Sequence, residues 1–406
     1  MKKFINSFRK LNKKYKIILV SATIFALLIR CLWLDARSGD YNDYLLPWIN
    51  HIRDLGYFES LKYNVGNYNI PYVVILTLIS FLKCEPLYPI KIISIIFDFV
   101  CAIYSAKIVY KLSNKNMLYS FITYTVILFL PTVIINGSMW GQCDSIFTSF
   151  TLISLYYLLD KEYTKSFIFF GISFAFKLQA IFLLPLYILV FFREKNIKLY
   201  HFLLIPLVNI LMCLPAIIMG RSISDVLLIY FNQAEYYDSI VMNFANLYNF
   251  FIDDIFFYTK YFELITKIGI IFTMFLFFCM WLYVLIKKVK FNSEKIITVG
   301  MWSIMIATFF LPRMHDRYMF VLDILSVIWL IIYHKKTYIP FVINIVSFIM
   351  YFNFLFGLKF IDYKILSILY FIVIFIFTIH TLRILSVDNE EKIEKEYKIR
   401  KQLKKC

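Results

Sequence analysis

The chain has 406 residues, of which 61% are hydrophobic, 20% aromatic and 17% charged, and its formal net charge is +17. Soluble domains are about half apolar and about one quarter charged, so this composition excludes a soluble globule and indicates an all-α, polytopic helical membrane protein. Lys and Arg lie mostly in short loops and at the two ends, as the positive-inside rule requires, so the charge gives no indication of a nucleic-acid partner.

The seven cysteines lie singly along the chain. Their spacing predicts neither a disulfide framework nor a zinc site. No motif indicates a cofactor. The sequence leaves a divalent metal ion open, but no set of candidate ligands indicates one.

Apolar runs follow one another through the whole sequence. They cover 15–34, 70–83, 88–111, 117–136, 145–160, 165–193, 200–219, 263–287, 296–311, 317–334, 338–357 and 364–385. The run at 70–83 is short for a full span of about 20 residues, whereas 165–193 is long and holds Lys177 near its middle.

Charge decides between two ways of threading these runs. If 70–83 spans the membrane, several basic loops fall outside. If 70–83 only enters the outer leaflet and 165–193 breaks at Lys177 into two short helices, those loops become cytoplasmic, as the positive-inside rule favours. We therefore expect about twelve transmembrane helices with both termini cytoplasmic.

This threading divides the chain into four parts. We expect an N-terminal transmembrane module at 1–219 that contains a first extracytoplasmic loop at 35–87, a second extracytoplasmic loop at 220–262, a C-terminal transmembrane module at 263–385 and a basic cytoplasmic tail at 386–406.

Each large extracytoplasmic loop is expected to hold an interfacial helix lying on the membrane. In the first loop Asn42 or Asp43 can cap a helix whose apolar residues recur at helical spacing. In the second loop Ser222 and Asp225 resemble the start of a capping box.

The acidic motif Gly39–Asp43 follows the first apolar run, and Asn67, Tyr68 and Asn69 follow further along the same loop. A general base must be a carboxylate held within reach of the proton that it takes. Asp40 is our first candidate and Asp43 our second, with helix capping as the alternative for both.

A second acid, Asp144, opens a span directly after Trp140, Gly141 and Gln142. An acid in a first turn also stabilises the helix dipole. A helix cap, however, does not call for a neighbouring tryptophan and amide, so we expect Asp144, Trp140 and Gln142 to belong to a site.

Lys177, with Gln179 beside it, lies inside an apolar run, where an ionisable residue is costly and marks a candidate site. We expect Lys177 to neutralise a lipid phosphate, with snorkelling to the interface as the alternative. Arg313 and Arg317, four residues apart, would share a helix face unless Arg313 precedes the helix. Arginine forks match phosphate, and His315 between them could bind the same group.

Two further acids lie inside apolar runs, and we expect them to be structural. Asp98 would pair with a base such as Arg30 or Lys107. Asp323 carries no motif that points to chemistry.

Four segments resemble one family. They are 39–72 (GDYNDYLLPWINHIRDLGYFESLKYNVGNYNIPY), 136–144 (NGSMWGQCD), 171–186 (GISFAFKLQAIFLLPL) and 311–318 (LPRMHDRY). In this order they resemble bacterial integral-membrane glycosyltransferases of the GT-C class, similar to the second mannosyltransferase of GPI-anchor assembly. Ile70 replaces a common proline, Asp43 a common amide and Asp316 a glutamate.

The resemblance implies an enzyme that transfers a hexose, such as mannose, from a polyprenyl-phosphate donor to an acceptor glycan, lipid or protein on the extracytoplasmic face of a bacterial plasma membrane. It implies that Asp40 is the catalytic base, that Asp144 is the second-loop acid and that Lys177 lies near the donor phosphate. The alternatives are a lipid-linked oligosaccharide polymerase or ligase, and a lipid-glycan transporter, although no internal repeat supports the transporter.

Overall fold

A computed structural model describes residues 12–235, 239–251, 255–334 and 336–387 of the chain. The elements in order are α2 (Lys13–Cys31), η1 (Tyr41–Leu45), α3 (Leu46–Asp54), η2 (Tyr57–Lys62), α4 (Ile70–Ser80), α5 (Leu87–Leu112), α6 (Met117–Phe129), α7 (Pro131–Ile134), η3 (Ile135–Trp140), α8 (Asp144–Leu159), α9 (Tyr163–Phe176), η4 (Leu178–Leu183), α10 (Leu184–Phe191), α11 (Leu199–Met212), α12 (Leu214–Ile218), α13 (Ile223–Glu235), β1 (Val241–Met242), η5 (Leu247–Phe250), α14 (Ile255–Ile286), α15 (Ser293–Phe310), β2 (Met314–His315), α16 (Phe320–Tyr333), α17 (Tyr338–Phe356) and α18 (Tyr363–Ser386).

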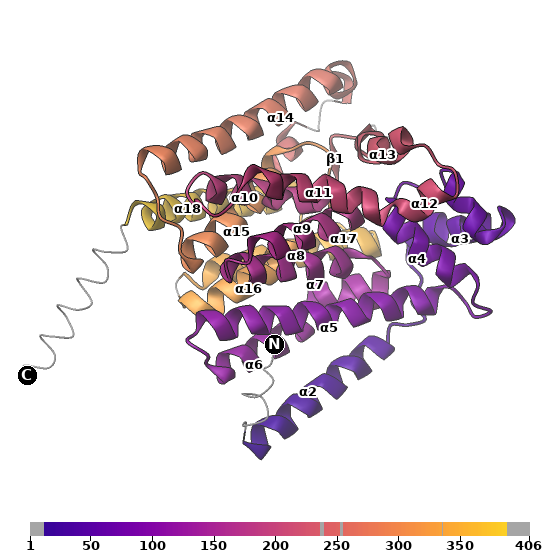
Figure 1. Ribbon diagram of the computed structural model, residues 1–406, viewed down its shortest axis with the longest axis horizontal. Helices are drawn as coiled ribbons and strands as arrows, with labels where there is room; N and C mark the ends of the chain where they lie inside the picture. The colour runs from indigo at the N-terminus through magenta and orange to yellow at the C-terminus, as the bar shows by residue number, and fades with distance from the viewer. Residues whose placement is uncertain (1–11, 236–238, 252–254, 335, 388–406) are drawn as a thin grey trace, which may run out of the picture.

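The helices form one bundle in which the first and second halves of the chain share a core (Figure 1). Helices α5, α8 and α9 pack in sequence, and α16 from the second half packs against α5 and α6. Figure 1 shows α2 and α14 on opposite flanks of the bundle. The all-helical fold class predicted from the sequence is confirmed.

Five helices are long and apolar enough to cross a membrane, and a sixth span results if the bent pair α6 and α7–η3 counts as one. The other apolar helices of the described chain have only 10–17 residues, below the about 20 residues of a full span. Helix length therefore supports a multi-pass membrane protein but does not establish the expected twelve spans.

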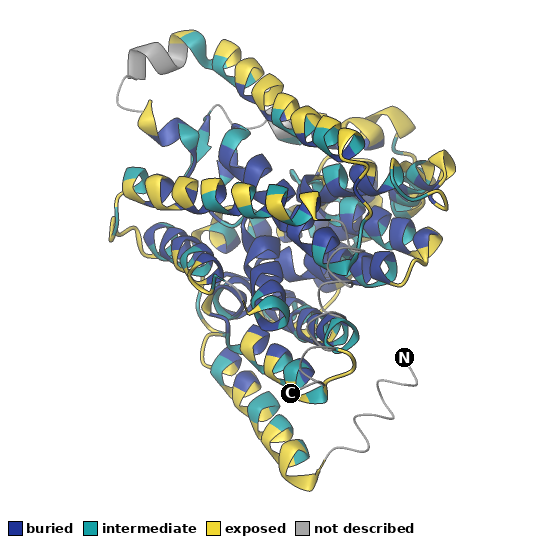
Figure 2. Cartoon of the chain, turned by 90° about the vertical axis from the view of Figure 1, so that its left-hand side faces the viewer, coloured by how far each residue is buried: buried dark blue, intermediate teal, exposed yellow. Residues whose placement is uncertain are grey.

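Apolar side chains also cover much of the outside of the bundle. On α14 the exposed residues include Ile268, Ile271 and Phe275, and Figure 2 shows this helix as largely exposed along its outer face. An exposed apolar helix face of this kind is typical of contact with a membrane or with a partner, in agreement with a multi-pass membrane protein.

The long run at 165–193 breaks where the sequence predicted. Helix α9 ends at Phe176, Lys177 is extended with φ −152° and ψ 134°, and η4 begins at the next residue. Helix α4, from the short run at 70–83, has 11 residues and is about 16 Å long at 1.5 Å per residue.

The two expected loop helices form, but one cap differs. Helix α3 buries Ile49 and Ile52. The predicted cap by Asn42 or Asp43 is wrong, because the Ser38 Oγ accepts the backbone N–H of Tyr41 at 3.2 Å instead. In the second loop the Ser222 Oγ accepts the backbone N–H of Asp225 at 3.0 Å, at the start of α13, as predicted.

The second loop is also tied to the segment before α16. Strand β1 pairs in parallel with β2, with Val241 opposite Met314 and Met242 opposite His315. The sequence did not indicate these two short strands. The basic residues before Asn12 and the tail after Val387 lie outside the described residues, and the predicted division into modules stays a prediction.

Candidate active site

A cavity with a volume of about 1110 Å³ lies where four of the predicted motifs meet. Polar groups from the first loop, the 140–144 turn, the Lys177 break and the 311–318 segment all line it. Among these are Asp40, Asn67, Tyr68, Gln142, Lys177, Gln179, Arg313, His315 and Arg317. Apolar side chains of α13, η4 and α14, including Phe231, Phe182 and Ile270, complete the wall.

Asp40 faces this cavity from the residue just before η1. Its Oδ2 accepts hydrogen bonds from Trp140 Nε1 at 3.0 Å and from Gln142 Nε2 at 2.5 Å, and Arg317 Nη1 lies 3.4 Å away. All of these contacts reach one oxygen of the carboxylate. The contacts fix the carboxylate on one side, which is the arrangement that a general base requires.

The turn that holds Asp40 depends on a glycine. Gly141 has φ +77°, a left-handed conformation that glycine adopts without strain. This bend lets Trp140 and Gln142 reach the same oxygen of Asp40. Trp140 is fully buried and stacks on Phe354 with ring centroids 5.0 Å apart, so the donor to Asp40 cannot swing away.

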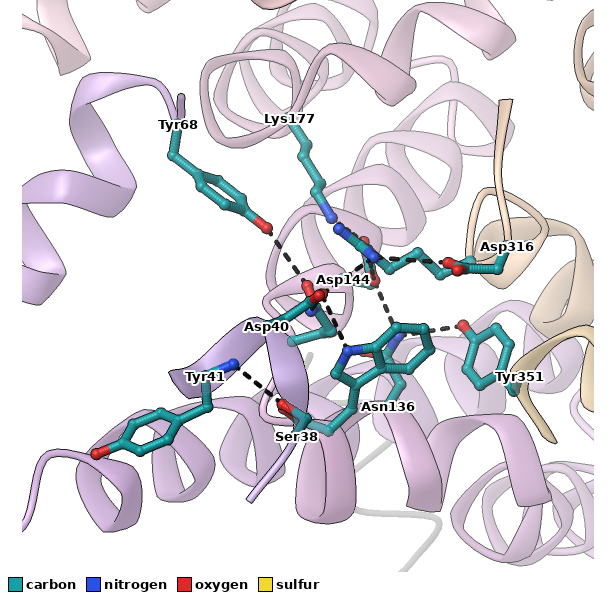
Figure 3. A network of polar contacts seen from close by, with 12 residues as sticks. Ser38, Asp40, Tyr41, Tyr68, Asn136, Asp144, Lys177, Asp316 and Tyr351 are labelled. Carbon is teal, nitrogen blue, oxygen red and sulfur yellow. Dashed lines mark hydrogen bonds and ion pairs between the residues drawn. The ribbon is translucent and has the colours of Figure 1, made fainter. Parts of the chain in front are cut away.

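Ser38 ties the two loops together behind Asp40. Its Oγ donates a hydrogen bond to the carbonyl oxygen of Trp140 at 2.9 Å. In Figure 3 the side chain of Tyr41 points away from Asp40, whereas that of Tyr68 points toward the cluster. The Tyr68 hydroxyl donates to Gln142 Oε1 at 3.3 Å, which orients the amide nitrogen of Gln142 toward Asp40.

Asp144 lies deeper and carries the second acidic motif. Lys177 Nζ contacts Asp144 Oδ1, while Oδ2 accepts a hydrogen bond from Asn136 Nδ2 at 2.8 Å and lies 3.7 Å from Arg317 Nε. No side-chain cap bond forms at the start of α8. The alternative in which Asp144 merely caps that helix is therefore wrong, because its carboxylate binds side chains of other segments.

Arg317 lies between three acidic side chains. It lies within ion-pair distance of Asp40 and Asp144, and its Nη1 is 3.5 Å from Asp316 Oδ1. The guanidinium also covers the Trp140 ring at 5.3 Å from its centroid. A planar, delocalised cation suits such a shared position, because it presents several donors in a fixed fork.

These pairings change the role expected for Lys177. The sequence predicted a lysine that neutralises a lipid phosphate, but here the ammonium is buried against Asp144. Lys177 and Arg317 together face three acidic side chains, those of Asp40, Asp144 and Asp316. Both cations are thus engaged by acidic side chains of the same site.

The two arginines do not lie on one helix face. Residues 311–319 form a bend, β2 and a turn, and α16 begins only at Phe320. Both side chains nevertheless line the cavity, where Arg313 covers the Phe262 ring at 5.0 Å from its centroid. Arg313 also has φ +62°, a left-handed backbone conformation that is uncommon for a residue with a side chain.

Besides Asp144, three predicted residues do not line the cavity. Asp43 is exposed and does not line the cavity. Asn69 is buried, and its Nδ2 lies within hydrogen-bond distance of the carbonyl oxygen of Ala175, Asn209 Oδ1 and Tyr230 Oη, so it ties helices together. Trp140 lies behind the cavity wall, where it contacts the lining residues Asp40, Phe354 and Arg317.

Gln179 and His315 line the cavity as the sequence predicted. Gln179 is buried, and its Oε1 has no hydrogen-bond partner among the described residues. Burial, together with the positive charges of Arg317 and Lys177, holds the pKa of His315 well below its usual value of 6.5. The imidazole is therefore neutral at physiological pH.

Of the two acids predicted to be structural, Asp98 pairs with Arg30 Nε at 2.9 Å and not with Lys107. Asp323 accepts a hydrogen bond from Ser347 Oγ at 2.7 Å. Asn136 and Tyr351 were missed as members of the site. Asn136 lies in the same segment as Trp140, but nothing in the sequence placed Tyr351, from α17, at 3.1 Å from Asn136 Nδ2.

Within the described ranges, no group of three or more His, Cys, Asp or Glu side chains is arranged to hold a metal ion. The acids of the cavity are engaged by a guanidinium, an ammonium and amide groups instead. The positive charge at this site is thus supplied by the chain itself.

Asp316 gives the site a pH dependence. Its side chain is buried, and burial raises the pKa of this carboxyl to about 7, with Arg317 acting in the opposite direction. The folded protein therefore holds a proton on Asp316 that the unfolded chain releases at lower pH, so the stability contributed by this group is lost as the pH rises toward 7.

We expect Asp316→Asn, which keeps the shape and stays neutral, to gain thermal stability relative to wild type as the pH is raised from about 5 to about 8. The measurement is the melting temperature of both proteins in detergent across this range. A difference between them that stays constant with pH would show that Asp316 does not titrate in this window.

No protein-family model matches the chain, and the comparison with curated proteins gives no match. The residues of the cavity and their geometry are therefore the evidence on its function.

Proposed function

We propose that this protein is a membrane glycosyltransferase that moves a hexose from a polyprenyl-phosphate donor to an acceptor glycan, lipid or protein. The observation that carries the proposal is Asp40, whose carboxylate faces a cavity of about 1110 Å³ with Lys177 and Arg317 close by. Acid, guanidinium and ammonium groups are what transfer of a sugar from a phosphate leaving group needs.

In the proposed reaction Asp40 takes the proton of the acceptor hydroxyl as its oxygen attacks the anomeric carbon. The bond from that carbon to the phosphate oxygen breaks, and polyprenyl phosphate leaves with the electron pair. Protonation of Asp40 removes the negative charge beside Arg317 Nη1, which frees the guanidinium to stabilise the departing phosphate. Asp144 keeps Lys177 and Arg317 in place.

The cavity wall supports both halves of such a donor. Amide and phenol groups of Gln142, Gln179 and Tyr68 suit hydroxyl groups of a sugar. Phe231, which also lines the cavity, suits an apolar chain. The cavity volume of about 1110 Å³ lies at the upper end of the range for ligand pockets, about 300–1,000 Å³.

In the proposed topology, twelve segments cross the membrane, α4 enters only its outer leaflet, and the cavity opens on the extracytoplasmic face of a bacterial plasma membrane. Membrane lipids surround the apolar outer faces. Support comes from the break at Lys177 and the short helix α4, both of which the threading with cytoplasmic basic loops requires.

We expect opposite labelling of cysteines introduced at Asn64 and at Asn196, two exposed loop positions. In a background without exposed native cysteines, an impermeant thiol reagent applied outside intact cells should label Asn64→Cys and not Asn196→Cys. Labelling of Asn196→Cys from outside would contradict the topology, and with it the location of the site.

The alternatives predict different features. A lipid-linked oligosaccharide polymerase or ligase would consume a lipid-linked chain of sugars and leave a single-sugar donor intact. A transporter would move its substrate unchanged. Asp98, the acid that the sequence places near mid-membrane, is fully buried against Arg30 and does not line the cavity that holds Asp40, which favours an enzyme over a transporter.

The test is to incubate the purified protein in detergent with a panel of polyprenyl-phosphate hexoses and a membrane extract as the source of acceptor. We expect loss of one donor and release of polyprenyl phosphate, with or without a chelator of divalent metals. A nucleotide sugar serves as the control donor. If every polyprenyl-phosphate sugar is recovered intact while a lipid-linked oligosaccharide is consumed, the polymerase or ligase replaces this proposal.

A further inference from the structure

One face of α5 carries three polar side chains that the proposed reaction does not use. Lys91, Ser94 and Asp98 are spaced three and four residues apart, so they form one stripe along the helix. All three are buried. Each lies against one or both of two segments. The first, residues 33–41, contains Asp40, and the second, residues 137–144, contains its hydrogen-bond donors Trp140 and Gln142.

Lys91 contacts the segment before Asp40. Its Nζ donates to the carbonyl oxygens of Trp33 at 2.7 Å, Leu34 at 3.1 Å and Ala36 at 2.5 Å. An ammonium group has three N–H donors, and here all three bond to carbonyl oxygens within residues 33–36. These carbonyls lie in the turns that follow the end of α2 at Cys31, and the Trp33 oxygen also accepts the backbone N–H of Ala36 at 3.1 Å.

The stem of Lys91 also lies beside the second segment. A Cβ placed on Gly141 would be 3.6 Å from Lys91 Cγ and 3.8 Å from Lys91 Cε. Gly141 is the residue between the two side chains that donate to Asp40. Lys91 is therefore in contact with both segments at once, through its apolar stem and its charged end.

The next residue of the stripe holds the second segment directly. Ser94 Oγ donates to the carbonyl oxygen of Gln142 at 2.7 Å, and the Ser145 Oγ donates back to the carbonyl oxygen of Ser94 at 2.8 Å. One turn further on, Asp98 pairs with Arg30 of α2 and approaches Gly137, where a Cβ would lie 2.9 Å from its Oδ2.

We propose that Lys91 is a positioning residue, which with Ser94 sets the distance between Asp40 and its donors Trp140 and Gln142. This inference rests on the proposed function, because it assigns Lys91 to the geometry of the proposed base. Lys91 does not line the cavity and acts only through Asp40. A misplacement of about 1 Å in a catalytic group can cost about 100-fold in rate.

The test compares Lys91→Met with wild type in two measurements. In hydrogen exchange followed by mass spectrometry, the amides of residues 33–41 should exchange faster in Lys91→Met, while those of the remaining helices keep their rates. In the transfer assay, kcat should fall about 10- to 100-fold, while KM for the donor changes by less than about twofold, because the residues lining the cavity are intact.

Lys107→Met is the matched control. Lys107 lies on the same helix, but its Nζ is 4.0 Å from the centroid of the Tyr104 ring, far along α5 from both segments. This variant should leave the exchange of residues 33–41 and kcat unchanged. If Lys107→Met lowers kcat as much as Lys91→Met does, the loss of any lysine from α5 is enough to lower kcat, and the positioning role of Lys91 is wrong.

Several results would overturn the inference. Unchanged kcat in Lys91→Met is one, and a fall in kcat accompanied by faster exchange across the whole protein is another, because it indicates an ordinary role in folding. If Lys91→Met does not fold, Ser94→Ala decides: we expect faster exchange at 140–144 with kcat reduced several-fold, and wild-type kcat would contradict the role.

The exchange measurement separates this inference from the proposed function. If the wild-type protein transfers no sugar, the proposed function fails on its own assay. The positioning of residues 33–41 by Lys91 is then supported or refuted by whether faster exchange in Lys91→Met is confined to that segment.

Discussion

Replacement of Asp40 by Asn should lower the turnover of the transferase by about 10²–10⁴-fold, the usual contribution of a general base. Asn keeps the shape of the side chain and removes its basicity. The Trp140 and Gln142 donors that now reach Oδ2 at 3.0 Å and 2.5 Å can still bond to the amide oxygen, so the variant should fold and insert normally. The measurement is kcat with a polyprenyl-phosphate hexose.

Asp43→Asn is the matched control for this prediction. Asp43 carries the same charge in the same helical segment, but it is exposed and outside the cavity. Its amide variant should retain wild-type turnover. If Asp43→Asn is inactive and Asp40→Asn is active, the base is the other acid of the motif, and the geometry around Asp40 serves another purpose.

Replacement of Lys177 by Met should have the second largest effect. It leaves the buried Asp144 without its ammonium partner, and breaking a buried ion pair in this way costs about 3–5 kcal/mol of stability. Turnover should fall as well, because a cation beside the leaving phosphate is lost. Thermal unfolding in detergent and kcat give the two readouts.

The double variant Lys177→Met/Asp144→Asn separates these effects. Removing both charges leaves no unpaired carboxylate, so most of the lost stability should return, whereas turnover should stay low. Recovery of turnover together with stability would mean that Lys177 serves only to neutralise Asp144 and has no part in the transfer.

Local rules were enough to predict much of the fold. The break at Lys177 could be predicted because a lysine inside an apolar run is costly unless it has a polar partner. In the structure that partner is Asp144, which belongs to another predicted motif. Likewise, the apolar spacing of residues 45–55 predicted α3. These features depend on neighbouring residues, which a single sequence displays.

Contacts between distant segments could not be predicted in the same way. Trp140 and Gln142 bind Asp40 from about 100 positions along the chain, and no spacing rule connects them. Asn69 was misassigned for a related reason, since a buried amide that satisfies groups on three other helices has the same sequence signature as one that binds a sugar.

The arginine motif shows a third limit. Two arginines four residues apart predict one face only if the segment is helical, but β2 forms there because β1 supplies its hydrogen-bond partner from a loop far away in the sequence. Both arginines still reach the cavity. The residue types were therefore a better guide to the site than the assumed secondary structure.

The anomeric configuration of the transferred sugar is the most direct test of the central claim, which is a single attack by an acceptor hydroxyl that Asp40 deprotonates. NMR of the product formed from a polyprenyl-phosphate hexose of known configuration gives the answer. The account predicts inversion, because the acceptor attacks the face opposite the departing phosphate. Retention of the donor's configuration would contradict it, since that outcome requires a second displacement and a nucleophile in place of a base.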